Sequence, residues 1–213
     1  MQYFSISEIK GWDRFYRTNF INSLQGYKPV SLIGTINEKG QKNLAIFSNI
    51  VHIGADPALI GFINRPVEAA PHTISNIKIT GHYTINHVHT SFIAAAHQTS
   101  AKYASDTDEF GTVGLTPSFK EGFLAPFVGE SHIQYGLQLV EIVPISHNNT
   151  FLVIGNITHV FLNEGLVQKD GFIDAEKAGT VASLGIDGYY TTGLVDRYEY
   201  AKPGRAPRKL DRF

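Results

Sequence analysis

Residues 30–36 read VSLIGTI and residues 43–49 read NLAIFSN, and these two runs decide the fold class of the chain. Both runs are rich in apolar and β-branched residues, as β-strands are. The residues between them include Asn37-Glu38-Lys39-Gly40, in which Asn and Gly suit a turn. The sequence therefore predicts a β-hairpin with a loop of four or five residues.

Further runs continue this pattern along the chain. We expect strands at residues 58–64, 83–88, 133–143 and 150–161, the last two joined by a turn at residues 146–149. One helix is expected from Pro71 to the residue before Gly81, and a second over residues 91–103, stopped by the polar residues 105–109. Antiparallel strands joined by short turns favour a mainly β fold, a closed or nearly closed β-barrel with inserted helices.

The composition is that of one globular domain without cysteine chemistry. The chain has 213 residues, and no repeat or linker divides it, so we expect a single domain over residues 1–213. The absence of cysteine excludes disulfides, thiol nucleophiles and Cys-ligated metal clusters. The net charge of −1 gives no reason to expect a nucleic-acid partner. Only 17% of the residues are charged, which favours an oligomer.

Several familiar motifs are missing from the sequence. It contains no P-loop, Rossmann or nucleophile-elbow pattern. His87 and His89 lack a third ligand at a recognisable spacing, so we expect no metal. Residues 1–20 carry charges where a signal peptide needs an apolar core, and residues 79–101 contain too many polar side chains for a membrane span. We therefore predict a cytoplasmic protein without a membrane partner.

One part of the sequence has residues that suit a cofactor-binding site. Residues 40–49 supply small, hydroxyl-bearing and amide-bearing side chains along one expected strand, which suit a flat polar heterocycle. Arg65 follows an expected buried strand, and Thr73 opens a helix whose unpaired N–H groups favour a phosphate. Asn76 lies one turn further, with Lys78 nearby. Together these residues predict a phosphate site, although an Arg near a helix start is more often a surface ion pair.

The order of several short motifs resembles that of the flavin reductase-like family. The motifs are PVSLI at residues 29–33, NLAIFS at 43–48, Asp56-Pro57, Arg65 followed by TISNI at 73–77, GHYTIN at 81–86, DEF at 108–110 and GLT at 114–116. They cover roughly residues 27–165 in the family's order, which is far more specific than any single motif. The resemblance implies an FMN-binding split β-barrel, a Greek-key antiparallel barrel.

The resemblance also implies which residues hold FMN. Those of the first hairpin would line the isoalloxazine ring and ribityl chain: Asn43, Ala45, Phe47, Ser48 and Asn49. Those near the first helix would hold the phosphate: Arg65, Thr73 and Asn76, with Lys78 nearby. The expected second helix would bring three more residues to the cofactor: His97, Ser100 and Tyr103. The family often has Pro where this chain has Ile46, so the backbone of this segment is less constrained here.

The activity implied by the resemblance is that of an oxidoreductase with FMN as cofactor and NAD(P)H as a transient donor, which would deliver a hydride to the flavin N5. Such a transfer needs a shaped pocket but no acid or base, so no catalytic residue is expected. The alternative is an FMN-binding electron carrier, flavoredoxin-like, without NAD(P)H turnover. A phosphate-cofactor binder of the pyridoxamine-phosphate-oxidase type would be expected to have a richer basic cluster than Arg65 with Lys78.

The resemblance further implies a homodimer, with a protein electron acceptor as an additional partner still open. Residues from about 166 to 213 resemble the family only loosely, and we expect them to form an extension that wraps the second subunit. Its last part, residues 197–213, carries six basic and two acidic residues. Residues 183–190, SLGIDGYY, could form either an aromatic flap over the flavin or a dimer contact.

Overall fold

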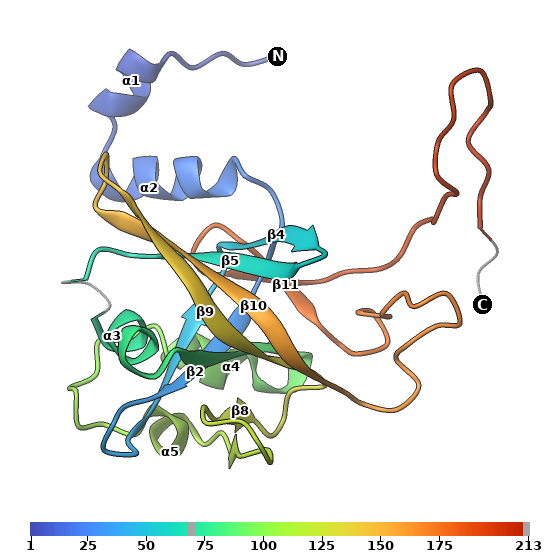
Figure 1. The fold of residues 1–213 in the computed structure, drawn as a ribbon. Helices are drawn as coiled ribbons and strands as arrows, with labels where there is room; N and C mark the ends of the chain where they lie inside the picture. The colour runs from blue at the N-terminus through green and yellow to red at the C-terminus, as the bar shows by residue number, and fades with distance from the viewer. Residues whose placement is uncertain (68–70, 211–213) are drawn as a thin grey trace.

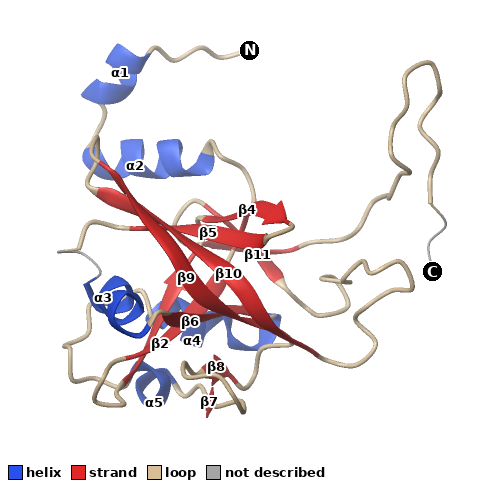
Figure 2. Ribbon diagram, in the orientation of Figure 1, coloured by secondary structure: helices blue, strands red, loops and turns tan. Residues whose placement is uncertain are grey.

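The computed structural model describes residues 1–67 and 71–210, and antiparallel strands dominate it (Figure 1 and Figure 2). The strands are β1 (Lys28–Pro29), β2 (Ser31–Ile36), β3 (Lys42–Phe47), β4 (Ile50–Ala55), β5 (Ala58–Asn64), β6 (His82–His87), β7 (Pro117–Ser118), β8 (Phe127–Val128), β9 (Ile133–Ile145), β10 (Thr150–Leu162), β11 (Val181–Leu184) and β12 (Gly188–Thr191). The helices are α1 (Ile6–Gly11), α2 (Arg14–Ser23), α3 (Pro71–Thr80), α4 (Ile93–Gln98) and α5 (Glu109–Val113), with a short 3-10 helix, η1 (Thr90–Phe92).

The main sheet is a curled, seven-stranded antiparallel sheet with the order β3-β2-β6-β9-β10-β5-β4. Its two edge strands, β3 and β4, are separated in sequence by Ser48 and Asn49 alone. Two residues cannot cross a flat sheet of seven strands that lie about 4.8 Å apart, so the sheet must curl until its edges meet. The mainly β prediction is confirmed, and the curled sheet is a split barrel of the expected kind.

The hairpin that decided the fold class is formed by β2 and β3. Ser31 pairs with Phe47 and Ile36 pairs with Lys42, across a loop in which Gly40 has a φ of 79°. Every residue of β2 is buried, because both of its faces are covered. On one face Leu32 belongs to the same core cluster as residues of α4 and α5, and on the other Ile33 packs with Phe62 in the barrel interior. A strand buried on both faces reads as a continuous apolar run.

The strands and the helix predicted around this hairpin are confirmed, within one or two residues at their ends. The second predicted helix, over residues 91–103, was too long, because α4 ends at Gln98. The hydroxyl of Thr99 donates to the carbonyl of Ala96, so a side chain competes here for a backbone acceptor. The polar segment 105–109 does more than end the preceding helix, since its last residue, Glu109, begins α5.

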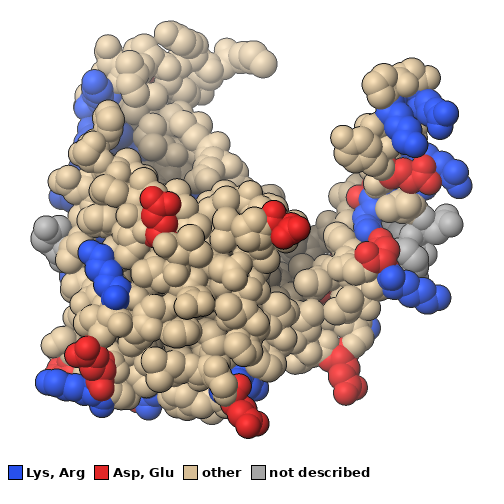
Figure 3. All heavy atoms as spheres, in the orientation of Figure 1, with Lys and Arg blue, Asp and Glu red and all other residues tan. Residues whose placement is uncertain are grey.

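The C-terminal third adds a small sheet and a long arm. β11 pairs with both β1 and β12 in a three-stranded sheet. After Thr191 the chain leaves the barrel, and Figure 1 shows residues 192–210 as an arm that extends away from it. The arm folds back on itself through a bridge between Tyr198 and Lys209, and basic side chains gather on it in Figure 3. Asp211 and Arg212 of the predicted basic tail lie outside the described residues.

Within residues 1–67 and 71–210, no helix has both the length and the apolar character needed to cross a membrane.

Candidate cofactor-binding site

A cavity of about 330 Å³ lies against β3 and is lined by segments from distant parts of the chain. Its volume lies at the lower end of the range of about 300–1,000 Å³ that is usual for ligand pockets. Ten of the twelve residues predicted to hold the cofactor line it: Asn43, Ala45, Phe47, Ser48, Asn49, Arg65, Thr73, His97, Ser100 and Tyr103. The fold therefore brings together residues 43–49, Arg65, Thr73 and residues 97–103, which span 60 residues of sequence.

Two of the predicted residues, Asn76 and Lys78, do not line this cavity. The buried Asn76 side chain donates to the hydroxyl of Thr35 at 3.0 Å and lines a neighbouring polar hollow instead. Lys78 has its ammonium 5.6 Å from the centre of the Phe151 ring. Five residues along a helix correspond to a rotation of about 140°, so Lys78 faces away from Thr73, which does line the cavity.

β3 supplies one wall of the cavity because it is an edge strand. It pairs with β2 on one side, so a row of its backbone N–H and C=O groups is left unpaired by the main sheet. Residues 43–49 of this segment line the cavity. Both backbone and side-chain groups of the hairpin therefore face the space that a polar heterocycle would fill.

A buried hydrogen-bond network fixes one end of this wall. The Thr73 hydroxyl lies 3.2 Å from the Asn43 amide, and in the amide orientation that satisfies both partners the Asn43 NH₂ donates to Glu109 at 3.3 Å. The Leu44 N–H also donates to Glu109. Burial raises the pKa of Glu109, so its neutral form is favoured relative to an exposed Glu. The sequence placed Glu109 in a polar segment that stops a helix and in the DEF motif of the resemblance, but not among the cofactor-binding residues, and its position on the cavity comes from tertiary packing.

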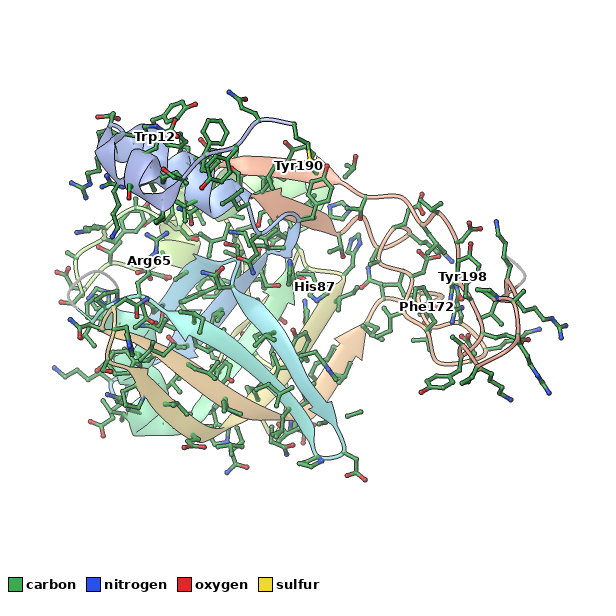
Figure 4. The ribbon with its side chains drawn as sticks, turned by 90° about the horizontal axis from the view of Figure 1, so that it is seen from above. Trp12, Arg65, His87, Phe172, Tyr190 and Tyr198 are labelled. Atoms are coloured by element: carbon green, nitrogen blue, oxygen red, sulfur yellow. The ribbon has the colours of Figure 1, made fainter. Side chains whose placement is uncertain are left out.

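The hairpin of β11 and β12 forms another wall of the cavity. Ser183, Gly185, Ile186 and Tyr189 line the cavity, which agrees with the flap alternative for residues 183–190. The next residue, Tyr190, instead packs against Tyr27 with the ring centres 4.9 Å apart. Figure 4 shows Tyr190 on this hairpin, beside the segment that follows α2.

Nothing in the sequence indicated that Lys28 is a cavity residue, and Ser183 was named only within residues 183–190, for which a flap over the flavin and a dimer contact stayed open. Both line the cavity, and they are direct partners in the β1–β11 pairing. A lysine in front of Pro29 carries no local signal of burial, and the pairing that buries it spans 155 residues of sequence. Among residues 1–67 and 71–210 no group of three His, Cys, Asp or Glu side chains is arranged to hold a metal ion.

Comparison with known proteins agrees with this geometry. The family described as "Flavin reductase like domain" matches residues 27–177. A protein from Shewanella frigidimarina, described as a flavin reductase with a split-barrel domain, is 46% identical to this chain. Its crystal structure has a TM-score of 0.91 and covers 94% of this chain and all of its own. Flavoredoxin of Desulfovibrio vulgaris is 25% identical, with a TM-score of 0.71 over 85% and 93% of the two chains. Nitrilotriacetate monooxygenase component B from Bacillus cereus shares the fold, at 21% identity and a TM-score of 0.81 over 92% and 98%.

Proposed function

The chain belongs to the flavin reductase-like family, and from this premise we propose that it is an FMN-binding oxidoreductase that takes electrons from NADH or NADPH. The observation that carries the proposal is the cavity itself. Its walls come from residues 43–49, Arg65, Thr73 and the end of α4, which are the segments through which the family resemblance assigns the flavin.

The residues of the cavity fit FMN. Amide and hydroxyl groups of Asn43, Ser48 and Asn49 suit the polar edge of a flat heterocycle, and the exposed backbone of β3 adds further partners. Arg65 and the first turn of α3 at Thr73 provide positive charge and N–H donors for a phosphate. The buried Ser183 hydroxyl has no hydrogen-bond partner among the described residues, as expected of a group that a ligand satisfies.

FMN, when bound, supplies a ring that accepts a hydride and passes electrons on. The chain's own residues bind, orient and shield it. His97 and Tyr189 line the cavity and are joined by a hydrogen bond, and together they would shield the flavin from water on their side. No acid or base is needed at the site, so Glu109 acts by holding Asn43 and Leu44 in place.

A second candidate is an FMN-binding electron carrier that does not turn over NAD(P)H. The likeness to flavoredoxin, at 25% identity, favours it. The two candidates share the flavin site and differ in whether a nicotinamide can reach the flavin, so one experiment separates them.

The experiment adds FMN to the purified protein, removes unbound flavin by desalting, and then adds NADH or NADPH without oxygen. Retained flavin bands that bleach support the oxidoreductase, and retained bands that do not bleach support the carrier. The Arg65→Gln variant should weaken FMN binding by about tenfold, because a charge-assisted bond to phosphate is lost. Arg14→Gln, in the exposed α2, serves as the matched control. Absence of FMN binding in a fluorescence titration would overturn both candidates.

We also propose that the protein forms a homodimer, in which residues from about 166 onward wrap around the second subunit. The arm of residues 192–210 extends away from the barrel, and Tyr200 on it is 93% exposed. A tyrosine of that exposure on an extended arm is suited to burial against a second subunit. An electron-acceptor protein is proposed as a further partner of the reduced state.

A further inference from the structure

A buried lysine forms part of the cavity wall. Lys28 is 5% exposed, and its ammonium donates to the carbonyl of Gly185 at 3.0 Å. An ammonium group can donate three hydrogen bonds. Within residues 1–67 and 71–210, the Lys28 ammonium donates one, to the carbonyl of Gly185. Burying such a charge is unfavourable unless an anion compensates it. Lys28 therefore has unused donors at a place where an unsatisfied charge is costly.

A second cation faces the same space. Arg65, labelled in Figure 4, follows β5 and lines the same cavity as Lys28. Burial lowers the pKa of Lys28, and the positive charge of Arg65 lowers it further. The four ion pairs found in the described part of the chain involve neither residue. Two cations thus lie near each other without a described acidic partner between them.

A buried hydroxyl completes the group. Ser183 is 5% exposed, lines the cavity, and its Oγ atom has no hydrogen-bond partner among the described residues. Ser183 is the direct partner of Lys28 in the β1–β11 ladder. Directly opposite residues of an antiparallel pair project from the same face, so the two side chains lie on one side of this small sheet.

We propose that Lys28, Arg65 and Ser183 form an anion-binding corner of the cavity that takes a phosphate group of a bound nucleotide. A phosphate ester carries up to two negative charges and several acceptor oxygens, which matches two cations and one hydroxyl. Glu109, the acidic residue that lines the same cavity, is held by Leu44 and Asn43 and does not supply the missing charge. The choice of a nucleotide rests on the proposed function.

The phosphate could belong to the flavin or to the nicotinamide donor, and two ligand pairs distinguish these sources. FMN and riboflavin differ by a phosphate, and their affinities are measured by quenching of flavin fluorescence. Reduced nicotinamide mononucleotide and reduced nicotinamide riboside likewise differ by a phosphate, and their KM values are compared in the FMN-loaded protein.

If the corner holds the flavin phosphate, Lys28→Met should lower the affinity for FMN by about tenfold and leave that for riboflavin within about twofold. If it holds the nicotinamide phosphate, the same variant should raise the KM for the mononucleotide and spare the neutral analogue. Lys28→Arg should restore most of the lost preference for the phosphate-bearing ligand of each pair, because it keeps the positive charge. Lys39→Met, in the exposed loop between β2 and β3, is the matched control.

Ser183→Ala provides a second test, since removing a hydroxyl without a described partner should not unfold the protein. It should reduce the preference for the phosphate-bearing ligand of the same pair by about threefold. Unchanged discrimination in both ligand pairs for Lys28→Met and Ser183→Ala would overturn the proposal. Should the wild-type protein bind neither flavin, the proposed function fails, and calorimetry with inorganic phosphate then tests the corner alone: binding that Lys28→Met abolishes supports it, and no binding by the wild type overturns it.

Discussion

The Nδ1 atom of His97 lies 2.8 Å from the hydroxyl oxygen of Tyr189, and this contact joins α4 to the β11–β12 hairpin. The two rings meet edge to face, with their centres 5.7 Å apart. Burial raises the pKa of Tyr189, and the charge of Asp187 raises it further, so the hydroxyl keeps its proton and can donate it to His97. Both residues line the cavity. The hydrogen bond therefore holds one cavity wall against another.

Tyr189→Phe removes this hydrogen bond and keeps the ring. We expect FMN to bind about fivefold more weakly, because the hairpin that lines the cavity is held by one contact less. Fluorescence titration measures the effect. Tyr190→Phe is the matched control, since Tyr190 packs against Tyr27 and does not line the cavity. Equal affinities for the two variants would show that the contact plays no part in holding the ligand.

His87 should make the stability of the protein depend on pH. It lies at the end of β6 with its ring 6.1 Å from that of Tyr135, and burial lowers its pKa to about 4 (Figure 4). In the unfolded chain its pKa is about 6.5, so between these values the unfolded state binds the proton more strongly. The stabilisation by neutral His87 is thus complete above pH 6.5 and is lost as the pH falls towards 4.

The expected loss between pH 7 and pH 4.5 is about 2 kcal/mol in the free energy of unfolding. Urea unfolding at the two pH values measures it. His87→Gln should remove most of this dependence, whereas His147→Gln, in the exposed turn between β9 and β10, should keep it. A wild-type pH dependence no larger than that of His87→Gln would contradict the assignment.

Local sequence patterns predicted the strands and turns that are marked by apolar runs and turn residues. The hairpin of β2 and β3 follows from apolar runs around Asn37 and Gly40, and the bounds of β5 agree with the expected strand at residues 58–64. The end of α4 could not be placed, because the hydroxyl of Thr99 competes for a backbone acceptor that a helix pattern assigns to the main chain.

One continuous segment of the site could be predicted from local signals, whereas distant segments were predicted only through the family resemblance, as for His97, or not at all, as for Lys28. The run from Asn43 to Asn49 was recognised as a unit. Lys28, Ser183 and Tyr189 reach the cavity through the pairing of β1 with β11 and of β11 with β12, and such long-range pairing leaves no periodicity in the sequence. Lys78 was assigned by proximity in sequence, whereas the turn of α3 directs it towards Phe151.

Gly34, in the first hairpin, should not tolerate a side chain. A Cβ atom there would meet the backbone carbonyl of Pro126 and lie 2.6 Å from the hydroxyl of Thr84, which itself donates to that carbonyl at 2.7 Å. Because backbone cannot move aside cheaply, Gly34→Ala should lower the free energy of unfolding by about 3 kcal/mol. Urea unfolding checks this, with Gly11→Ala as the control because nothing lies within 4 Å of its added Cβ.

The arm should contribute to a dimer through its apolar residues. We expect the 213-residue chain to sediment at micromolar concentration with twice the 23.5 kDa mass of one chain. A chain ending at Thr192 should dissociate at concentrations at least about tenfold higher, because the arm would no longer bury surface on the partner. The double variant Tyr198→Ser and Tyr200→Ser should behave like the truncation, since these rings are 50% and 93% exposed.

Lys202→Ser with Arg205→Ser is the matched control on the same arm, because it removes charge and leaves both rings in place. A monomeric 213-residue chain at micromolar concentration would contradict the dimer. A dimer that the truncation leaves equally tight would contradict the role of the arm, because the two subunits would then associate through the barrel alone.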